Sequence, residues 1–143
     1  NPACVIKGAH QSGVNALSMA FAPHDANIII VVSGGDDQVL RVQSIDISTT
    51  GLTLSRGGTF DFAHSSAIRS IWTDGTKIVS TSVDQRVKVW DVSHALDAIE
   101  IHPRGGVVTQ APEPEAIDVV RASHDNSLTL VVAGRGFELF TIK

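Results

Sequence analysis

The stretch "IVSTSVDQRVKVWDV", Ile78–Val92, decides the fold. It contains a serine, an aspartate and a tryptophan at Ser80, Asp84 and Trp90, and His64 lies a short way upstream. Histidine, serine and aspartate are the side chains of a hydrolytic triad, but they are also polar groups that can join strands through buried hydrogen bonds. The sequence around the stretch separates these two interpretations.

The same stretch has the two-residue period of a β-strand. Val87 and Val89 fall on one face, while Arg86, Lys88 and Trp90 fall on the other, where the long basic stems can lie along the indole. Turn residues bound each run of Val, Ile and Thr in this part of the chain. We therefore expect four strands, near Ile68–Trp72, Lys77–Ser82, Arg86–Asp91 and Ile99–His102.

The pattern occurs twice. "AHQSGVNALSM", from Ala9, matches "AHSSAIRSIWT", from Ala63, and Ser33 and Asp37 follow the first copy as the serine and aspartate of the opening stretch follow the second. The histidine-to-aspartate separation is 27 positions in the first copy and 20 in the second. We expect the extra residues to form a longer loop around "APHDANI".

The chain divides into units of this kind. The first unit spans residues 9–62, the second residues 63–112, and a degenerate third, without the histidine and aspartate, residues 113–143; residues 1–8 are expected to be the outer strand of a preceding blade. Runs such as "IIIVV" are apolar on both faces, which predicts small sheets packed between neighbours. The predicted fold class is all-β, a β-propeller fragment of about three four-stranded blades, in which the third lacks its fourth strand.

Composition disfavours several classes of function. The 143 residues carry a formal net charge of -4 with Lys and Arg scattered, which disfavours direct nucleic-acid binding. Charged residues make up only 18%, below the roughly 25% of typical soluble domains, so much of the surface should face other protein. Cys4 is alone, the longest apolar run is too short for a bilayer, and the histidines lack metal-ligand spacing. We expect no cofactor, no metal, no membrane contact and a cytoplasmic location.

The chain resembles WD-repeat β-propeller sequences. Ala-His pairs stand in the Gly-His position of both units, and "STSVDQRVKVWD" matches the end of the repeat. The resemblance implies that histidine, serine, aspartate and tryptophan form a hydrogen-bonded network inside each blade. The first unit departs from the pattern, because Gln43 replaces the tryptophan and Ser44 the following aspartate. The implied structural network comprises His10, Ser33 and Asp37 in the first unit and His64, Ser80, Asp84 and Trp90 in the second.

A catalytic use of these side chains is the alternative. It would need a serine oxygen exposed in a cleft beside the imidazole, with an oxyanion hole nearby. The sequence has no Gly-x-Ser-x-Gly nucleophile elbow, and the same set of residue types occurs in two successive units. Duplication is typical of a structural network, so we predict that the chain is not an enzyme.

The order of the segments also resembles the carboxyl-terminal end of one WD-repeat family. "HQSGVNAL", "SGGDDQ", "AHSSAIRSI", "STSVDQRVKVW" and "VAGRGFELF" follow one another as in the WD-repeat partner subunit of the tRNA 2′-O-ribose methyltransferase that acts on the anticodon wobble nucleotide. The resemblance implies a non-catalytic scaffold that binds the methyltransferase, leaves S-adenosylmethionine to it, and contacts tRNA indirectly or elsewhere in a longer chain. The alternative is a general protein-interaction adaptor, such as a ubiquitin-ligase substrate receptor or a trafficking scaffold.

Overall fold

Runs of β-branched and aromatic residues, separated by turn residues, form strands throughout the chain. The structure, a computed structural model, describes residues 3–143 and contains strands but no helix in that range, so the all-β prediction is confirmed. No helix that could span a membrane is therefore found among these residues. The first sheet holds β1 (Val14–Ala22), β2 (Asp25–Gly35), β3 (Leu40–Ser48) and β4 (Gly51–Phe60). The second holds β5 (Ile68–Thr73), β6 (Lys77–Ser82), β7 (Arg86–His94) and β8 (Ile99–Val108), and the third holds β9 (Ala116–Arg121), β10 (Leu128–Ala133) and β11 (Phe137–Ile142).

The strands predicted for the second unit are all present, and β8 continues to Val108, beyond the predicted His102. Every sheet is antiparallel, with its strands side by side in chain order. The third sheet has three strands, as expected for a unit without its fourth strand.

The insertion in the first unit lengthens a hairpin. Pairing of β1 with β2 runs past Met19↔Val31 and Phe21↔Ile29 to Ala22↔Asp25, so only two residues remain for the turn. The prediction of a longer loop around "APHDANI" is therefore wrong. Apolar and β-branched residues on both sides of the turn keep the ladder paired, which satisfies backbone groups that a loop would leave to solvent.

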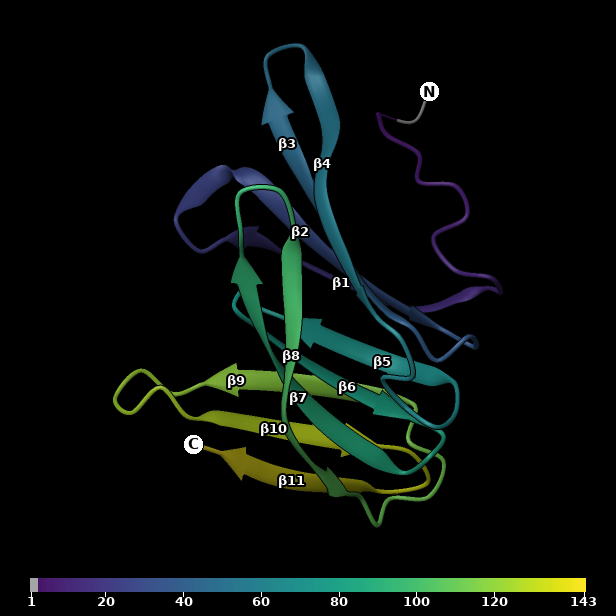
Figure 1. Cartoon of the computed structure of the whole chain (residues 1–143). Coiled ribbons are helices and arrows are strands. Elements are labelled where there is room, and N and C mark those ends of the chain that lie inside the picture. The colour runs from purple at the N-terminus through teal and green to yellow at the C-terminus, as the bar shows by residue number, and fades with distance from the viewer. Residues whose placement is uncertain (1–2) are drawn as a thin grey trace.

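The sheets are stacked in chain order, with β1, β5 and β9 as their neighbouring first strands (Figure 1). Between the first and second sheets, Ile30, Val32 and Leu40 pack against Ile68 and other buried apolar residues that include Trp90. Between the second and third sheets, a second core contains Val79, Val87, Val89, Val119, Leu128, Leu130 and Val132. The predicted alternation along β7 is thus confirmed, because Val87 and Val89 face the third sheet and Trp90 faces the first.

The two outer faces of the stack are apolar and uncovered. Met19 on β1 is 69% exposed, and Phe137 on β11 is 74% exposed. Exposed apolar faces of this kind are typical of sheets that pack against a further sheet or another protein. Residues 3–8 form no strand, because a strand needs a ladder partner and none is present beside them in the described chain. Residues 1 and 2 lie outside the described residues, so the outer strand predicted for residues 1–8 stays a prediction.

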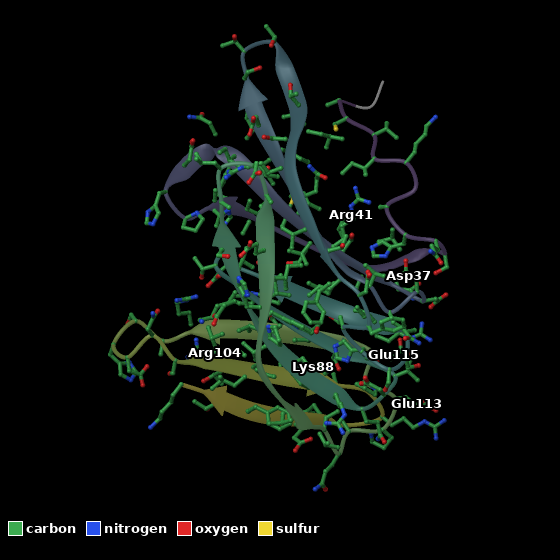
Figure 2. The ribbon with its side chains drawn as sticks, viewed as in Figure 1. Asp37, Arg41, Lys88, Arg104, Glu113 and Glu115 are labelled. Carbon is green, nitrogen blue, oxygen red and sulfur yellow. The ribbon has the colours of Figure 1, made fainter. Side chains whose placement is uncertain are left out.

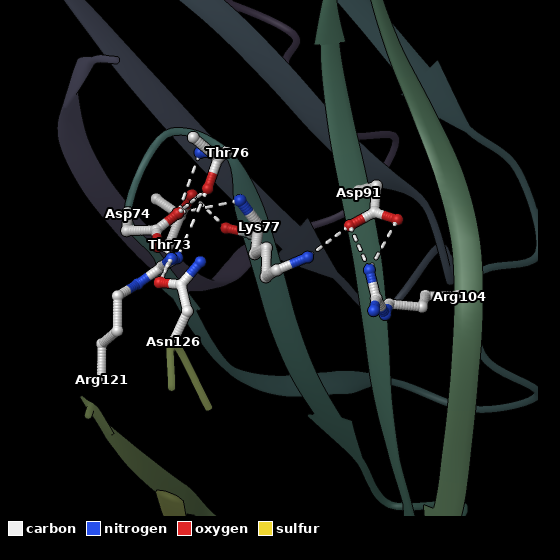
Figure 3. Close-up of polar contacts among 8 residues, drawn as sticks. All are labelled: Thr73, Asp74, Thr76, Lys77, Asp91, Arg104, Arg121 and Asn126. Carbon is white, nitrogen blue, oxygen red and sulfur yellow. Dashed lines mark hydrogen bonds and ion pairs between the residues drawn. The ribbon is translucent and has the colours of Figure 1, made fainter. Parts of the chain in front are cut away.

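A polar cluster lies around the turn between β5 and β6 and on the neighbouring parts of β7, β8 and β9 (Figure 3). Asp74, in the turn between β5 and β6, accepts hydrogen bonds from the backbone N–H groups of Thr76 and Lys77 at 2.9 and 2.8 Å. Arg121 of β9 forms an ion pair with Asp74, which ties the third sheet to this turn. Nearby, Asp91 pairs with Lys77 at 2.7 Å and with Arg104 at 3.3 Å.

Gly58→Ala tests how closely the outer strands approach. A Cβ at Gly58 of β4 would overlap the carbonyl oxygen of Ile99 of β8, so we expect the free energy of unfolding to fall by about 1–3 kcal/mol, the range for overpacking. Urea denaturation followed by tryptophan fluorescence measures the change. Gly136→Ala is the matched control, because a Cβ there meets no atom within 4 Å. Equal stability of the two variants would mean that the sheets are not in contact at β4 and β8.

Candidate functional site

The structure brings the four polar residues of the second unit together. His64 lies in the connection between β4 and β5, Ser80 lies on β6, and Asp84 lies in the turn that leads to β7. The Nε2 atom of His64 is 2.8 Å from Ser80 Oγ, and its Nδ1 atom is 3.0 Å from Asp84 Oδ2. The indole N–H of Trp90 donates to Ser80 Oγ at 2.9 Å. One continuous chain of hydrogen bonds therefore connects the strands β6 and β7, the turn between them and the connection between β4 and β5.

The direction of these bonds assigns the protonation of the imidazole. Because Trp90 donates to Ser80 Oγ, the serine hydroxyl donates its own proton to Nε2 of His64. The Nδ1–H of His64 then donates to Asp84, whose carboxylate also accepts the backbone N–H groups of Ser65 at 3.0 Å and Arg86 at 2.9 Å. A neutral imidazole satisfies every group in the chain, whereas an imidazolium would leave the serine proton without this acceptor.

The electrostatics agree with that assignment. Burial lowers the pKa of His64 below its ordinary value, since desolvation penalises the imidazolium; Asp84 opposes this effect, and the charges of Lys88 and Arg86 reinforce it. Burial also opposes ionisation of Asp84, but its contact with His64 and the backbone N–H groups outweigh burial and hold the pKa of the carboxyl below its usual range.

The turns that carry the aspartates have the same backbone in both units. Gln85 follows Asp84 with a φ of 60°, and Gln38 follows Asp37 with a φ of 66°, in the left-handed region. The carbonyl of Gln38 accepts the N–H of Ala63, and the carbonyl of Gln85 accepts the N–H of Thr109, both at 2.9 Å. Each turn therefore holds the connection that leads to the next sheet.

The first unit holds a shorter network. His10 lies 2.9 Å from Ser33 Oγ through Nε2 and 2.9 Å from Asp37 Oδ1 through Nδ1. Contact with His10 and the backbone hydrogen bonds at Asp37 outweigh the effect of burial, so the pKa of this carboxyl also lies below its usual value. Gln43, in the tryptophan position, donates to the backbone carbonyls of Ser44 and Arg56. Ser33 consequently receives no indole bond and lines a cavity of about 290 Å³ on the open face of the sheet.

The third unit is closed by a residue that sequence reasoning missed. Glu138 on β11 accepts hydrogen bonds from the hydroxyl of Thr109 at 2.9 Å and from the backbone N–H of Gln110 at 2.7 Å. The signal was present in "FELFTI", where one carboxylate interrupts an otherwise apolar strand. This glutamate holds the connection into the third unit, where the histidine and aspartate are absent.

The arrangement is suited to holding strands and unsuited to hydrolysis. Ser80 is fully buried, and His64, which borders a hollow of the surface, is only 1% exposed, so the serine oxygen is out of reach of a substrate. Both sides of Ser80 Oγ are already occupied, by Trp90 and His64. Within residues 3–143, no three His, Cys, Asp or Glu side chains are grouped as metal ligands. The geometry therefore resembles a triad in its distances and differs from one in its access.

Comparisons with known proteins agree with this geometry. The family model described as "WD domain, G-beta repeat" matches residues 3–44 and 45–91, together more than half of the chain. No curated protein matches. A chain in the structure described as a humanized mutant of the Chaetomium thermophilum Polycomb Repressive Complex 2 bound to the inhibitor GSK126 is similar in fold, with a TM-score of 0.60 at 12% identity. The match covers 94% of this chain and 36% of that one, so this chain spans about a third of its length.

Asp84→Ala tests the network. We expect it to lower the free energy of unfolding by about 1–3 kcal/mol, because the N–H groups of His64, Ser65 and Arg86 lose their acceptor. Thermal and urea denaturation measure the loss. Asp97→Ala removes an exposed carboxylate with no hydrogen-bond partner among the described residues and should change stability by less than about 0.5 kcal/mol. Similar losses in both variants would contradict a structural role for Asp84.

The pH dependence of stability tests the neutral imidazole. The pKa of His64 is lower in the folded chain than the value of 6.5 expected unfolded, so the unfolded state binds the proton more readily. Stability should therefore be greatest above pH 6.5 and decrease as the pH falls below it, with a further decrease below about pH 4 as Asp37 and Asp84 are protonated. Urea midpoints at a series of pH values measure this. His64→Gln should flatten the first decrease, and the exposed His102→Gln should not; a flat profile for the unsubstituted chain would refute the assignment.

Proposed function

Because the chain belongs to the WD domain, G-beta repeat family, we propose that it is a non-catalytic scaffold subunit that holds a partner protein. The observation that carries this proposal is the closed network of the second unit, in which the side chains that could perform hydrolysis are buried and fully hydrogen-bonded. Members of such a repeat family supply a rigid surface, and the chemistry belongs to the protein that binds there.

We propose that the partner is the S-adenosylmethionine-dependent methyltransferase that modifies the 2′-oxygen of the anticodon wobble ribose in tRNA. The order of segments from "HQSGVNAL" to "VAGRGFELF" supports this choice through its resemblance to the partner subunit of that enzyme. The net charge of -4 fits protein contact better than direct contact with tRNA phosphates. The complex would act in the cytoplasm, with methyl transfer performed wholly by the enzyme.

Purification of the full-length protein from its own cells, with stoichiometric partners identified by mass spectrometry, tests the proposal. We expect an S-adenosylmethionine-dependent methyltransferase to co-purify, and wobble 2′-O-methylation to fall when the chain is removed. A ribose methylation outside the anticodon loop serves as the internal control and should not change. Ubiquitin-ligase or trafficking components in place of the methyltransferase would make the partner assignment wrong and favour the adaptor alternative.

A further inference from the structure

Two neighbouring cations on β7 have no carboxylate partner. Within residues 3–143, no Asp or Glu oxygen lies within 4.0 Å of the side-chain nitrogens of Arg86 or Lys88. Four other cations are neutralised by ion pairs: Lys77 and Arg104 with Asp91, Arg121 with Asp74, and Arg135 with Glu113. The remaining cations are separated from one another in the sequence: Lys7, Arg41, Arg56, Arg69 and Lys143. A pair of uncompensated positive charges is therefore concentrated on one face of one strand, in a chain with a net charge of -4.

Lys88 makes a structural hydrogen bond that recurs in the first unit, whereas Arg86 makes none. Lys88 donates to the carbonyl of Ala63 at 2.6 Å. Arg41, in the equivalent position of the first unit, likewise donates to the carbonyl of Ala9 at 3.3 Å. Figure 2 labels both Lys88 and Arg41. Arg86 has no such counterpart, because Val39 occupies its position in the first unit. Its guanidinium makes no hydrogen bond to any described residue, so the blade does not need this charge for its own structure.

Both cations line two hollows that meet between the first and second sheets. One, of about 310 Å³, is walled by Phe60, Trp90 and the Pro103–Gly106 segment of β8. The other, of about 350 Å³, is walled by Gln38, Phe62, His64, Ser65 and Asp84. The Asp84 carboxylate is 6% exposed and already accepts hydrogen bonds from His64 and two backbone N–H groups, so it is turned away from a ligand in the hollow. Arg86 and Lys88 border both hollows, and we name the two adjacent hollows together the basic groove. It lies between two complete sheets of the same chain, so packing on the outer faces of the stack would leave it open.

The walls of the basic groove suit an extended chain. A Cβ at Gly105 would meet no atom within 4 Å, so the β8 side is open where the cations are. Pro103 offers no N–H there, and the β7–β8 ladder shifts register between Val89 and Trp90. Phe60 lines the floor of the groove above the buried Trp90, with Lys88 Nζ 5.8 Å from the centre of the Trp90 ring. An open groove with an apolar floor and two cations can hold alternating acidic and apolar side chains.

Phe62 is the second unusual feature of the groove. Its side chain is 80% exposed, and its φ of 53° places a bulky residue in the left-handed region. Such backbone strain costs on the order of 1–3 kcal/mol and tends to occur at binding sites. A large aromatic ring held in water beside two uncompensated charges can bury its surface only against another molecule.

We propose that the basic groove docks an extended acidic segment of the partner protein, with carboxylates against Arg86 and Lys88 and an apolar side chain against Phe62. Charge complementarity supports this occupant, since Arg86 and Lys88 lie two residues apart on one strand and neither is neutralised by an ion pair. A nucleic acid would need a longer basic surface than two cations in an acidic chain provide. This inference rests on the proposed scaffold role, but not on the identity of the methyltransferase.

Fluorescence anisotropy with the full-length protein tests the groove directly. The probe is a fluorescein-labelled nine-residue peptide with a central leucine flanked by glutamates, compared with the same peptide carrying glutamines. We expect the glutamate peptide to bind at least about tenfold more tightly, and its binding to weaken as NaCl rises from about 50 to about 300 mM. Equal binding of the two peptides would overturn a peptide site. Displacement of the glutamate peptide by millimolar inorganic phosphate, together with unchanged peptide affinity in Phe62→Asn, would also overturn it.

Variants locate the site without disturbing the fold. Arg86→Gln and Phe62→Asn alter side chains that are exposed, and asparagine tolerates positive φ. Each should weaken the peptide at least about tenfold while the melting temperature stays unchanged. Arg69→Gln, on exposed β5 surface outside the groove, is the matched control and should bind normally. In cells, a partner that co-purifies equally well with Arg86→Gln and Phe62→Asn would overturn the groove as its docking site and leave the scaffold role standing.

Discussion

A neutral imidazole, buried between a hydroxyl and a carboxylate, is the interaction on which the second unit depends. His64 accepts from Ser80 and donates to Asp84, so the connection from the first sheet, the strand β6 and the turn before β7 are fixed by one ring. Trp90 completes the chain and forms part of the core against the first sheet. The polar network and the apolar core therefore stabilise the same interface, and a change in either weakens both.

The networks also determine how the units depend on one another. In the second unit, the first sheet covers the network, and the Phe60 and Trp90 rings meet with centroids 4.9 Å apart. The network of the first unit faces the open side of the stack, where Ser33 lines a cavity. The two networks have nearly the same internal distances, and their histidine and aspartate side chains are similarly buried. They differ at the serine, because Ser80 is covered by Trp90 whereas Ser33 borders the cavity on the open face.

The sequence was sufficient for the parts of the fold that rest on local pattern. The alternation of Val87 and Val89 predicts which face of β7 is apolar, and the repeated spacing brings His64, Ser80 and Asp84 into one set. The hairpin insertion could not be predicted, because whether "APHDANI" loops out or lengthens the ladder depends on pairing across two strands. Glu138 and the basic groove were also missed, since each needs residues from two different units placed side by side.

The connection that follows each of the first two sheets is hydrogen-bonded to a turn within that sheet, so the contacts along the stack follow the order of the chain. The carbonyl of Gln38 accepts the N–H of Ala63, and the carbonyl of Gln85 accepts that of Thr109, so in both cases a later connection donates to an earlier turn. During synthesis the earlier segment leaves the ribosome first, and domains tend to fold in that order. The turn that accepts each of these hydrogen bonds is therefore made before the connection that donates it. The two backbone carbonyls thus favour addition of the sheets in order from the first to the third.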